Sequence, residues 1–481
     1  MIEISTLLVL VPIFGAILIW SLKKDKLSIF IAISSVVLVL VIAFIGHINL
    51  DPLVKGFQFQ ASYKWIPSWN VNISFGLDHL NSPFVLLTAF ITLISILLSV
   101  KTVKKNVSSY MAMFLLFEAT VLGFFLSTNF LVFFFFYEAM LIPAVLLIHR
   151  WGGKNSYSAS MKFLIYTFGF SIFLFISIIA VYVYAGGFDF DKLYSLKLSY
   201  QAKYLLFLGF FLAFAVKIPV VPLHGWLRDA YYESPMPVTI FLSAVLGKMG
   251  IYGLLRVTPA FSDILISAGP WILFLCILSF VYASFLALSE RDIKAMFAYM
   301  SLSHVGIITA GAFTGNIYGF QGSILQSINH GILAAALFYI ADLLNRHTAS
   351  FDGEKFGALS KRTPAMVFFT FACILAMGGF PGLNYFNGEL MLLSGIFANN
   401  TIMGFFAIFG VALGVVYLAW FFYRVFLRKP GGSMSEEVKD LKGIDFLIFI
   451  VFFFIFIYLG LNPKFIIGAL EPLVSVAGGK G

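Results

Sequence analysis

Long apolar runs, separated by short polar or Gly/Pro-containing segments, dominate the pattern of the chain. Runs such as "FLVFFFFYEAM" (130–140) and "FLIFIVFFFIFIY" (446–458) offer no polar face to water, so lipid or neighbouring membrane helices must bury them. Runs of about 20 apolar residues can cross the hydrocarbon core as helices. They give fourteen predicted spans, at 4–22, 27–46, 81–100, 109–127, 129–149, 161–185, 203–226, 238–258, 269–290, 296–314, 318–343, 364–399, 402–427 and 443–471. The predicted fold class is an all-α polytopic membrane protein of about fourteen transmembrane helices.

Two of the predicted spans are interrupted. The seventh contains Lys217, Pro219 and Pro222, and the twelfth is over-long and contains "GGFPGLNYFNGE" (378–389). Proline and glycine interrupt the helical hydrogen bonds, and the backbone groups left without partners must face protein or water rather than lipid. Each of these spans is therefore predicted to be a discontinuous helix of the kind that transporters use.

The order of the spans indicates weak internal symmetry. Spans four to eight (109–258) and nine to thirteen (269–427) form two five-helix units, each with one broken helix. Because each unit holds an odd number of helices, the second is inverted relative to the first. The predicted domains are thus helices one to three (1–108), the two inverted repeats, and a C-terminal connector with helix 14 (428–481).

Composition and charge support a membrane protein and set its predicted orientation. The chain is 61% hydrophobic and only 11% charged, with a mean hydropathy of +0.98. With loops assigned to alternate sides, 21 of the 31 basic residues follow odd-numbered spans, eight lie on the opposite side, and Lys217 and Lys248 lie within spans. The positive-inside rule then places both termini on the outer face, in the plasma membrane of a prokaryote. This asymmetry explains the net charge of +9, so nucleic-acid binding is not predicted.

The sequence offers no motif for a cofactor. Cys276 and Cys373 lie in separate apolar runs, without the spacing of a metal or cluster site, and are interpreted as small core residues. No His/Cys cluster suggests haem or iron–sulfur, and no soluble domain is long enough to hold a cofactor. We expect no cofactor or metal in this chain, and any redox chemistry in another one.

Ionisable residues inside the spans carry the candidate chemistry. These residues are Glu138, Lys217, Lys248 and Glu389, with Glu118 as a fifth candidate. Charged side chains in hydrocarbon are costly, and they mark ion pathways, static ion pairs or groups that snorkel to a span end. Acids and bases that alternate on broken helices favour proton handling, because a carboxylate that approaches or leaves a buried lysine changes its affinity for a proton. We expect Glu138 to pair with Lys217, Lys248 to relay protons, and Glu389 to be the terminal site.

Histidines fill the gap between Lys248 and Glu389 in chain order. His304 in "MSLSHVG" and His330 in "QSINHGILAAALF" lie within predicted spans, and an imidazole both donates and accepts protons near neutral pH. Each one alone is also compatible with a hydrogen-bonded core histidine. His224, in the interruption of the seventh span, could shuttle protons or only satisfy unwound carbonyls.

Five motifs together resemble one known family. They are "FAVKIPVVPLHGWLRDA" (214–230), "GKMGIYGLLR" (247–256), "RDIKAMFAYMSLSHVG" (291–306), "NHGILAAALF" (329–338) and "FPGLNYFNGE" (380–389). In this order they are similar to the antiporter-like subunits of respiratory complex I, whose relatives include multi-subunit sodium/proton antiporters and membrane-bound hydrogenases. The resemblance covers about residues 75–430. It is greatest to the M-type subunit, because Glu389 stands where the other subunits usually carry lysine.

The resemblance implies fourteen helices around a central polar axis. It also implies a proton path through Glu138, Lys217, Lys248, His304, His330 and Glu389, with quinone and iron–sulfur clusters in partner subunits. The expected partners are lipid and other membrane subunits, including further antiporter-like ones. Two features depart from the family pattern on the inner face: Arg228, where the family usually has proline, and "YYESPMPVT" (231–239). They bear on how protons enter there and on which electron-input module the complex uses, and they leave the axis intact.

Three other interpretations stay open at the level of the sequence. The chain could serve a sodium/proton antiporter without electron transfer, a hydrogenase-type assembly whose acceptor is not quinone, or an inert scaffold. Carboxylates also bind sodium, so the ion itself is open. Electron donor, quinone type and stoichiometry are not encoded in this chain.

Overall fold

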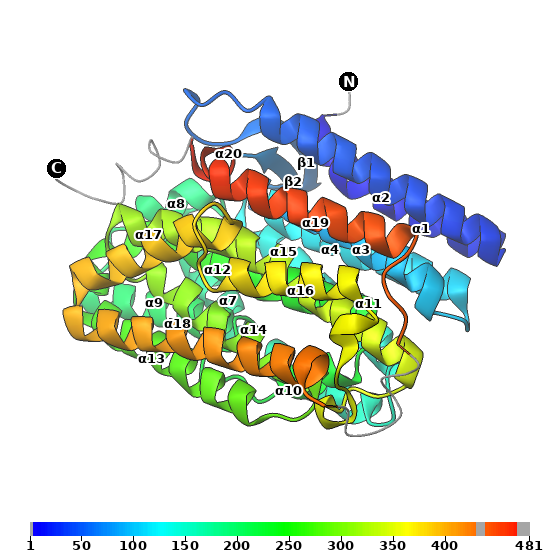
Figure 1. Cartoon of the computed structure of the whole chain (residues 1–481). Coiled ribbons are helices and arrows are strands. Elements are labelled where there is room, and N and C mark those ends of the chain that lie inside the picture. The colour runs from blue at the N-terminus through cyan, green and yellow to red at the C-terminus, as the bar shows by residue number, and fades with distance from the viewer. Residues whose placement is uncertain (1–2, 430–437, 469–481) are drawn as a thin grey trace.

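The computed structural model describes residues 3–429 and 438–468 of the chain. Its long helices run roughly parallel to one another and form a single bundle (Figure 1). The α-helices are α1 Ile4–Leu22, α2 Asp25–Ile48, α3 Ser82–Thr102, α4 Val107–Leu126, α5 Phe130–Ala139, α6 Leu141–Trp151, α7 Ser156–Ala185, α8 Phe190–Tyr194, α9 Tyr200–Lys217, α10 Leu227–Glu233, α11 Met236–Phe241, α12 Gly247–Val257, α13 Ser262–Ser289, α14 Ile293–Gly311, α15 Ile317–Thr348, α16 Pro364–Met377, α17 Asn384–Asn399, α18 Thr401–Phe422, α19 Ile444–Leu461 and α20 Lys464–Ile467. Short 3₁₀ turns cover Pro67–Trp69, Thr258–Phe261, Gly353–Lys355 and Leu359–Lys361, and π-helical turns cover Leu242–Leu246 and Tyr423–Leu427.

The helical membrane fold is confirmed, but the count of fourteen helices stays a prediction. Within the described ranges, twelve helical stretches are long and apolar enough to cross a membrane. One of them, Met236–Ser289, is a continuous helical stretch of 54 residues over which the sequence pattern places two spans. The predicted twelfth span is divided into α16 and α17, both of which are short. Much of the predicted connector and the end of the last span (430–437 and 469–481) lie outside the described residues.

Both predicted helix breaks are confirmed. Helix α9 ends at Lys217 and α10 begins at Leu227, so the proline-containing segment 218–226 is not α-helical. Helix α16 ends at Met377 and α17 begins at Asn384; between them Gly379 and Gly382 adopt φ of +67° and +90°, which favour glycine. A further break, not predicted, separates α5 from α6 at Met140, three residues before a proline.

A β-hairpin is an addition that the apolar pattern does not predict. Strands β1 (Gln58–Ile66) and β2 (Val71–Leu77) pair antiparallel between α2 and α3. Their residues are mixed in polarity and flanked by Pro67 and Asn70, the latter with a left-handed φ of +51° that closes the turn. Asp78, directly after β2, forms an ion pair of 2.6 Å with Arg256 at the end of α12 and joins the hairpin to the bundle.

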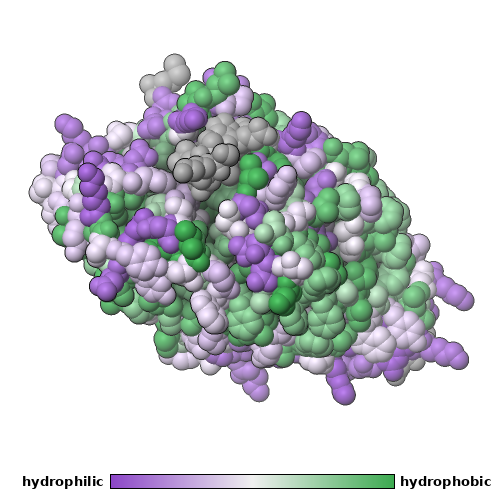
Figure 2. All heavy atoms as spheres, turned by 90° about the vertical axis from the view of Figure 1, so that its left-hand side faces the viewer, coloured by the Kyte–Doolittle hydropathy of each residue, from purple (hydrophilic) through white to green (hydrophobic). Residues whose placement is uncertain are grey.

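Burial separates central helices from lipid-facing ones. Helices α14 and α15 are enclosed almost completely, whereas α2, α18 and α19 expose large apolar side chains along much of their length. Cys276 and Cys373 are buried and unpaired, which confirms their interpretation as core residues. Figure 2 shows the end of the bundle at the left of Figure 1, where hydrophilic side chains are scattered among hydrophobic ones. The buried ionisable groups therefore lie inside a bundle whose sides are apolar.

Candidate functional site

The predicted ionisable residues come from seven helices and one loop. Lys217, Lys248 and Glu118 have no solvent-exposed surface, and His304, His330 and Glu389 are also buried. They lie on α9, α12, α4, α14, α15 and α17 respectively, Glu138 lies near the end of α5, and His224 lies in the segment between α9 and α10. The fold thus gathers groups that are up to 271 positions apart (118 to 389) inside one bundle.

Lys217 is held by Tyr137 rather than by a direct ion pair. Its Nζ donates to the Tyr137 carbonyl oxygen at 3.2 Å and lies 3.3 Å from the centroid of the Tyr137 ring, in a cation–π contact. The neighbouring Glu138 carboxylate interacts electrostatically with Lys217, but no ion pair within 4.0 Å joins them, and both carboxylate oxygens are buried without a hydrogen bond. The predicted partners are therefore neighbours that form no direct ion pair.

Lys248 contacts a histidine at a helix irregularity. It follows the π-helical turn Leu242–Leu246, and its Nζ donates to the Ser243 carbonyl oxygen at 2.7 Å. The same nitrogen lies 2.6 Å from His330 Nδ1. If Lys248 donates, His330 accepts at Nδ1 and carries its own proton on Nε2, an atom with no hydrogen-bond partner. The arrangement can pass a proton through the ring from one nitrogen to the other.

Tyrosines continue this row toward Glu389. The rings of His330 and His304 are 5.9 Å apart between centroids, and His304 Nε2 lies 3.1 Å from the Tyr417 hydroxyl. Tyr385 packs edge-on against His304, and its buried hydroxyl has no hydrogen-bond partner. Glu389 lies one helical turn after Tyr385, on the same face of α17. Tyr417 and Tyr385 thus connect the His304 ring to the helices around Glu389.

Glu389 lies against the second helix break. A Cβ atom added to Gly379 would come within 2.6 Å of Glu389 Oε2, so the carboxylate is packed against the backbone of the segment between α16 and α17. A movement of this segment would therefore change the surroundings of the carboxylate.

Two of the predicted residues lie apart from the row. The His224 ring packs against Tyr282, and its buried Nδ1 has no hydrogen-bond partner. Glu118, on α4, has two buried oxygens with no hydrogen bond. Neither touches Lys217, Lys248 or the two axial histidines.

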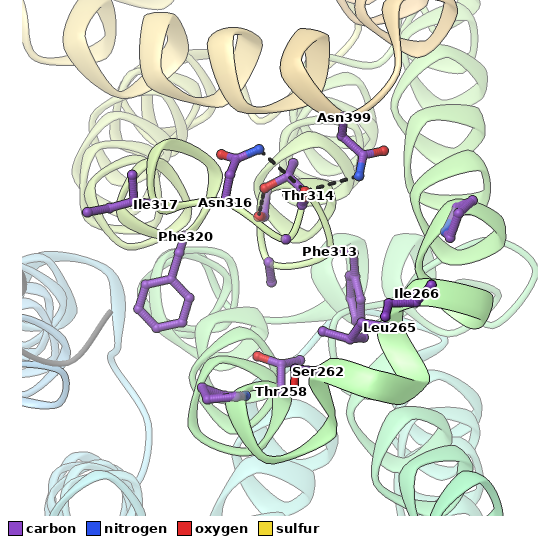
Figure 3. A pocket seen from close by; sticks show the side chains of 15 residues that line it. Thr258, Ser262, Leu265, Ile266, Phe313, Thr314, Asn316, Ile317, Phe320 and Asn399 are labelled. Atoms are coloured by element: carbon purple, nitrogen blue, oxygen red, sulfur yellow. Dashed lines mark hydrogen bonds between the residues drawn. The ribbon is translucent and has the colours of Figure 1, made fainter. Parts of the chain in front are cut away.

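Cavities lie at opposite ends of the bundle. A basin of about 970 Å³ lies at the start of α14 and the end of α15; seven Lys or Arg and two acidic residues line it. A vestibule of about 340 Å³ lies at the end of α14 and the start of α15 (Figure 3). Its polar rim contains Thr314, whose carbonyl oxygen accepts from Asn316 and Asn399 at 3.3 and 3.0 Å. The row of buried groups lies between these two openings.

Sequence reasoning missed the groups that hold the ionisable ones in place. Tyr137, Tyr385, Tyr417 and the carbonyl of Ser243 carry no net charge, and the chain has 21 tyrosines. Two signals in the sequence could have marked Tyr385 and Tyr137. Tyr385 precedes Glu389 by one helical turn, and Tyr137 directly precedes Glu138.

Comparison with known proteins gives a consistent result. A model of the family described as "NADH:quinone oxidoreductase/Mrp antiporter, TM" matches residues 127–414. NADH-quinone oxidoreductase subunit M of Rickettsia prowazekii is 33% identical over 456 residues, which cover 94% of this chain and 93% of that protein. NADH-ubiquinone oxidoreductase chain 4 of Marchantia polymorpha is 31% identical over 477 residues, which cover 97% and 95%.

The fold agrees with these sequence matches. A chain of respiratory complex I from Thermus thermophilus, solved with bound NADH, superposes with a TM-score of 0.90 at 27% identity, over 99% of this chain and 100% of that one. The resemblance inferred from five motifs therefore extends along nearly the whole chain. The chain belongs to the NADH:quinone oxidoreductase/Mrp antiporter transmembrane family, and within it to the antiporter-like M subunits of complex I.

Proposed function

We propose that this chain translocates protons as the M-type, antiporter-like subunit of a complex I-type enzyme. Electron transfer to quinone in sister subunits drives the movement. The observation that carries the proposal is the row Lys248, His330, His304 and Tyr417, which runs toward Glu389 between two openings at opposite ends of the bundle. A structural core has no need of such a row, because each unpaired buried polar group costs stability.

The separated pair Glu138 and Lys217 is the proposed switch. When the carboxylate approaches, it stabilises the ammonium form of Lys217; when it withdraws, the buried ammonium is left to the Tyr137 carbonyl and ring, and release of its proton is favoured. The segment after Lys217 is unwound, so the end of α9 can move without breaking a regular helix.

Protons then move along the row by exchange at named atoms. Lys248 donates to His330 Nδ1, and His330 releases its Nε2 proton toward His304 through a bridging water. His304 and the Tyr417 hydroxyl pass the proton on to the region of Glu389, which releases it to the vestibule end. Each step transfers one proton, and His330, left with its proton on Nδ1, must return to the Nε2–H tautomer before it accepts from Lys248 again.

The rest of the assembly supplies the redox chemistry in this proposal. The chain itself carries no catalytic redox site, and quinone and iron–sulfur clusters belong to partner subunits. Other membrane subunits, further antiporter-like ones included, are its neighbours. The chain lies in the plasma membrane of a prokaryote, with both termini on the outer face and the basin on the inner one. The two five-helix units act as inverted half-channels.

The test uses vesicles that hold the intact assembly and follows electron transfer, proton pumping and sodium uptake together. Lys217→Ala is compared with Lys203→Ala, which removes a lysine from the same helix but breaks only a surface ion pair with Asp263. We expect pumping to be lost in the first variant and retained in the second, without sodium dependence. Unchanged pumping in Lys217→Ala contradicts the proposal, and sodium flux that persists without electron transfer favours the antiporter interpretation.

A further inference from the structure

Glu118 is a buried acid that the central row does not use. Its side chain is fully buried in α4, and both carboxylate oxygens lack a hydrogen-bond partner. A buried polar group without partners is rare in folded proteins and calls for an explanation. The explanation lies in the helix that faces it.

Helix α3 presents a continuous polar face inside the bundle. Its members are spaced alternately by four and three residues, which places them on one side of the helix: Thr88, Thr92, Ser95, Ser99 and Thr102. Thr92 is the hydroxyl beside the Glu118 carboxylate, but it donates to the Thr88 carbonyl oxygen at 2.8 Å. The Ser95 hydroxyl, one turn along, is buried and has no partner at all. Both helices thus carry unsatisfied groups, within one turn of the contact between Thr92 and Glu118.

The other end of this polar face reaches the basin. Ser99 Oγ lies 3.3 Å from the Tyr110 hydroxyl, and the Tyr110 ring packs edge-on against Trp151 at 5.3 Å between centroids. Trp151 lines the basin, and so does Lys101, which follows Ser99 by two residues. From Ser99 to Thr92 the helix rises by about 10 Å, so two or three hydroxyls span the distance from the basin to the carboxylate.

Glu118 is also level with Glu138. Thr128 lies in the short connection between α4 and α5. Glu118 precedes it by ten positions and Glu138 follows it by ten. These helices pack antiparallel, with the Phe124 and Phe133 rings 4.1 Å apart. Adjacent helix axes are about 8–10 Å apart, and equal numbers of helical residues from the turn bring both carboxylates to the same depth.

We propose that the polar face of α3 forms a separate uptake branch, through which protons pass from the basin to Glu118 and then to Glu138. The inference rests on the proposed function, because it feeds the Glu138 and Lys217 switch. In each cycle the Glu118 carboxylate gains one proton through water and the hydroxyls of Ser99, Ser95 and Thr92. It then gives that proton through water to the Glu138 carboxylate. Each bridging hydroxyl gives up one proton and takes up another, so only the two carboxylates change their protonation.

The test compares variants that keep volume but remove hydroxyls, in the intact assembly in vesicles. Thr92→Val with Ser95→Ala is expected to lower the initial rate of proton pumping per assembled complex by about tenfold, part of what a positioned proton-transfer group supplies. Thr92→Ser keeps a hydroxyl and is expected to pump at the wild-type rate. Thr120→Val is the matched control, because its hydroxyl lies on the same helix as Glu118 and bonds only to the carbonyls of that helix.

Glu118→Gln gives a second, independent measurement and is expected to match the double variant. Two results would contradict the uptake branch while leaving the central row intact. One is a wild-type pumping rate in Thr92→Val/Ser95→Ala, and the other is a pumping rate in Thr92→Ser that falls as far as in the double variant. Lys217→Ala separates the two failures: if that variant pumps normally, the proposed function fails and the branch fails with it. If Lys217→Ala is inactive and the double variant is unchanged, only the branch is wrong.

Discussion

At the scale of single residues, Lys217 and Lys248 are each held by neutral groups rather than by an acid in direct contact. Lys217 has the carbonyl and ring of Tyr137, and Lys248 has the carbonyl of Ser243 and the ring of His330. Neutral partners hold an ammonium in place but bind it less strongly than a carboxylate in contact would. Lys248 can therefore lose its proton without leaving an orphaned acid beside it, whereas Lys217 has the unpartnered Glu138 carboxylate as its neighbour.

The Tyr417 hydroxyl is the best isolated link in the row. Tyr417→Phe removes only the group that lies 3.1 Å from His304 Nε2 and keeps the ring that packs around it. We expect a fall in pumping of about tenfold or more, because one proton-transfer group is removed, with normal assembly. Tyr231→Phe is the control, since that buried hydroxyl donates to a backbone carbonyl. Equal pumping in both variants would show that Tyr417 only packs.

The sequence marks charged residues well and their partners poorly. Only 11% of the chain is charged, so Glu138, Lys217 and Lys248 stand out in apolar runs. Tyr417 and Ser243 do not, because hydroxyls occur throughout membrane helices and a carbonyl is present at every residue. Their roles depend on a π-helical turn and on the packing of α14 against α18 and α17, which no local pattern predicts.

At the scale of elements, the breaks in α9–α10 and α16–α17 were predictable because proline and glycine act locally. The break between α16 and α17 allows a matched experiment. Gly379 and Gly382 both adopt positive φ, but only at Gly379 would a Cβ atom meet the Glu389 carboxylate; at Gly382 it meets nothing within 4 Å.

We predict that Gly379→Ala and Gly382→Ala destabilise the chain alike but differ in pumping. We expect the free energy of unfolding to fall by about 1–2 kcal/mol in each variant, because a residue with a Cβ atom is strained in a left-handed backbone conformation. Only Gly379→Ala displaces Glu389, so only this variant is expected to lose pumping. Thermal unfolding of the purified assembly measures the first effect, and vesicle pumping the second. A loss of pumping in both variants would assign the effect to the backbone of the break and not to Glu389.

The β-hairpin depends on one buried ion pair. Arg256 donates to Asp78 at 2.6 Å and to the Tyr252 hydroxyl at 2.8 Å, and both charged side chains are largely buried. Asp78→Ala leaves the Arg256 guanidinium without its counter-ion. We expect the free energy of unfolding to fall by about 3–5 kcal/mol, which is measured as a lower unfolding temperature. Lys203→Ala, which breaks an exposed pair of equal length, is expected to cost no more than about 1 kcal/mol. Similar losses in the two variants would contradict the anchoring role of Asp78.

At the scale of the whole molecule, the number of apolar runs predicted a helical membrane bundle because every run must be buried. The same reasoning overlooked the hairpin and merged α5 with α6, since neither changes the mean hydropathy of its segment. Orientation is the remaining global property, and it rests on basic residues alone. It decides whether the basin faces the inside or the outside of the cell, and hence the direction in which the proposed path runs.

Single introduced cysteines test this orientation. Cys276 and Cys373 are fully buried, so a membrane-impermeant maleimide should not label the wild-type chain in intact cells. Lys197 and Lys104 are both exposed: Lys197 precedes α9 on the side poor in basic residues, and Lys104 lines the basin. We expect Lys197→Cys to be labelled from outside and Lys104→Cys only after permeabilisation. The opposite result would place the basin on the outer face. Protons would then leave through the polar face of α3 rather than enter by it, even if every variant above behaved as expected.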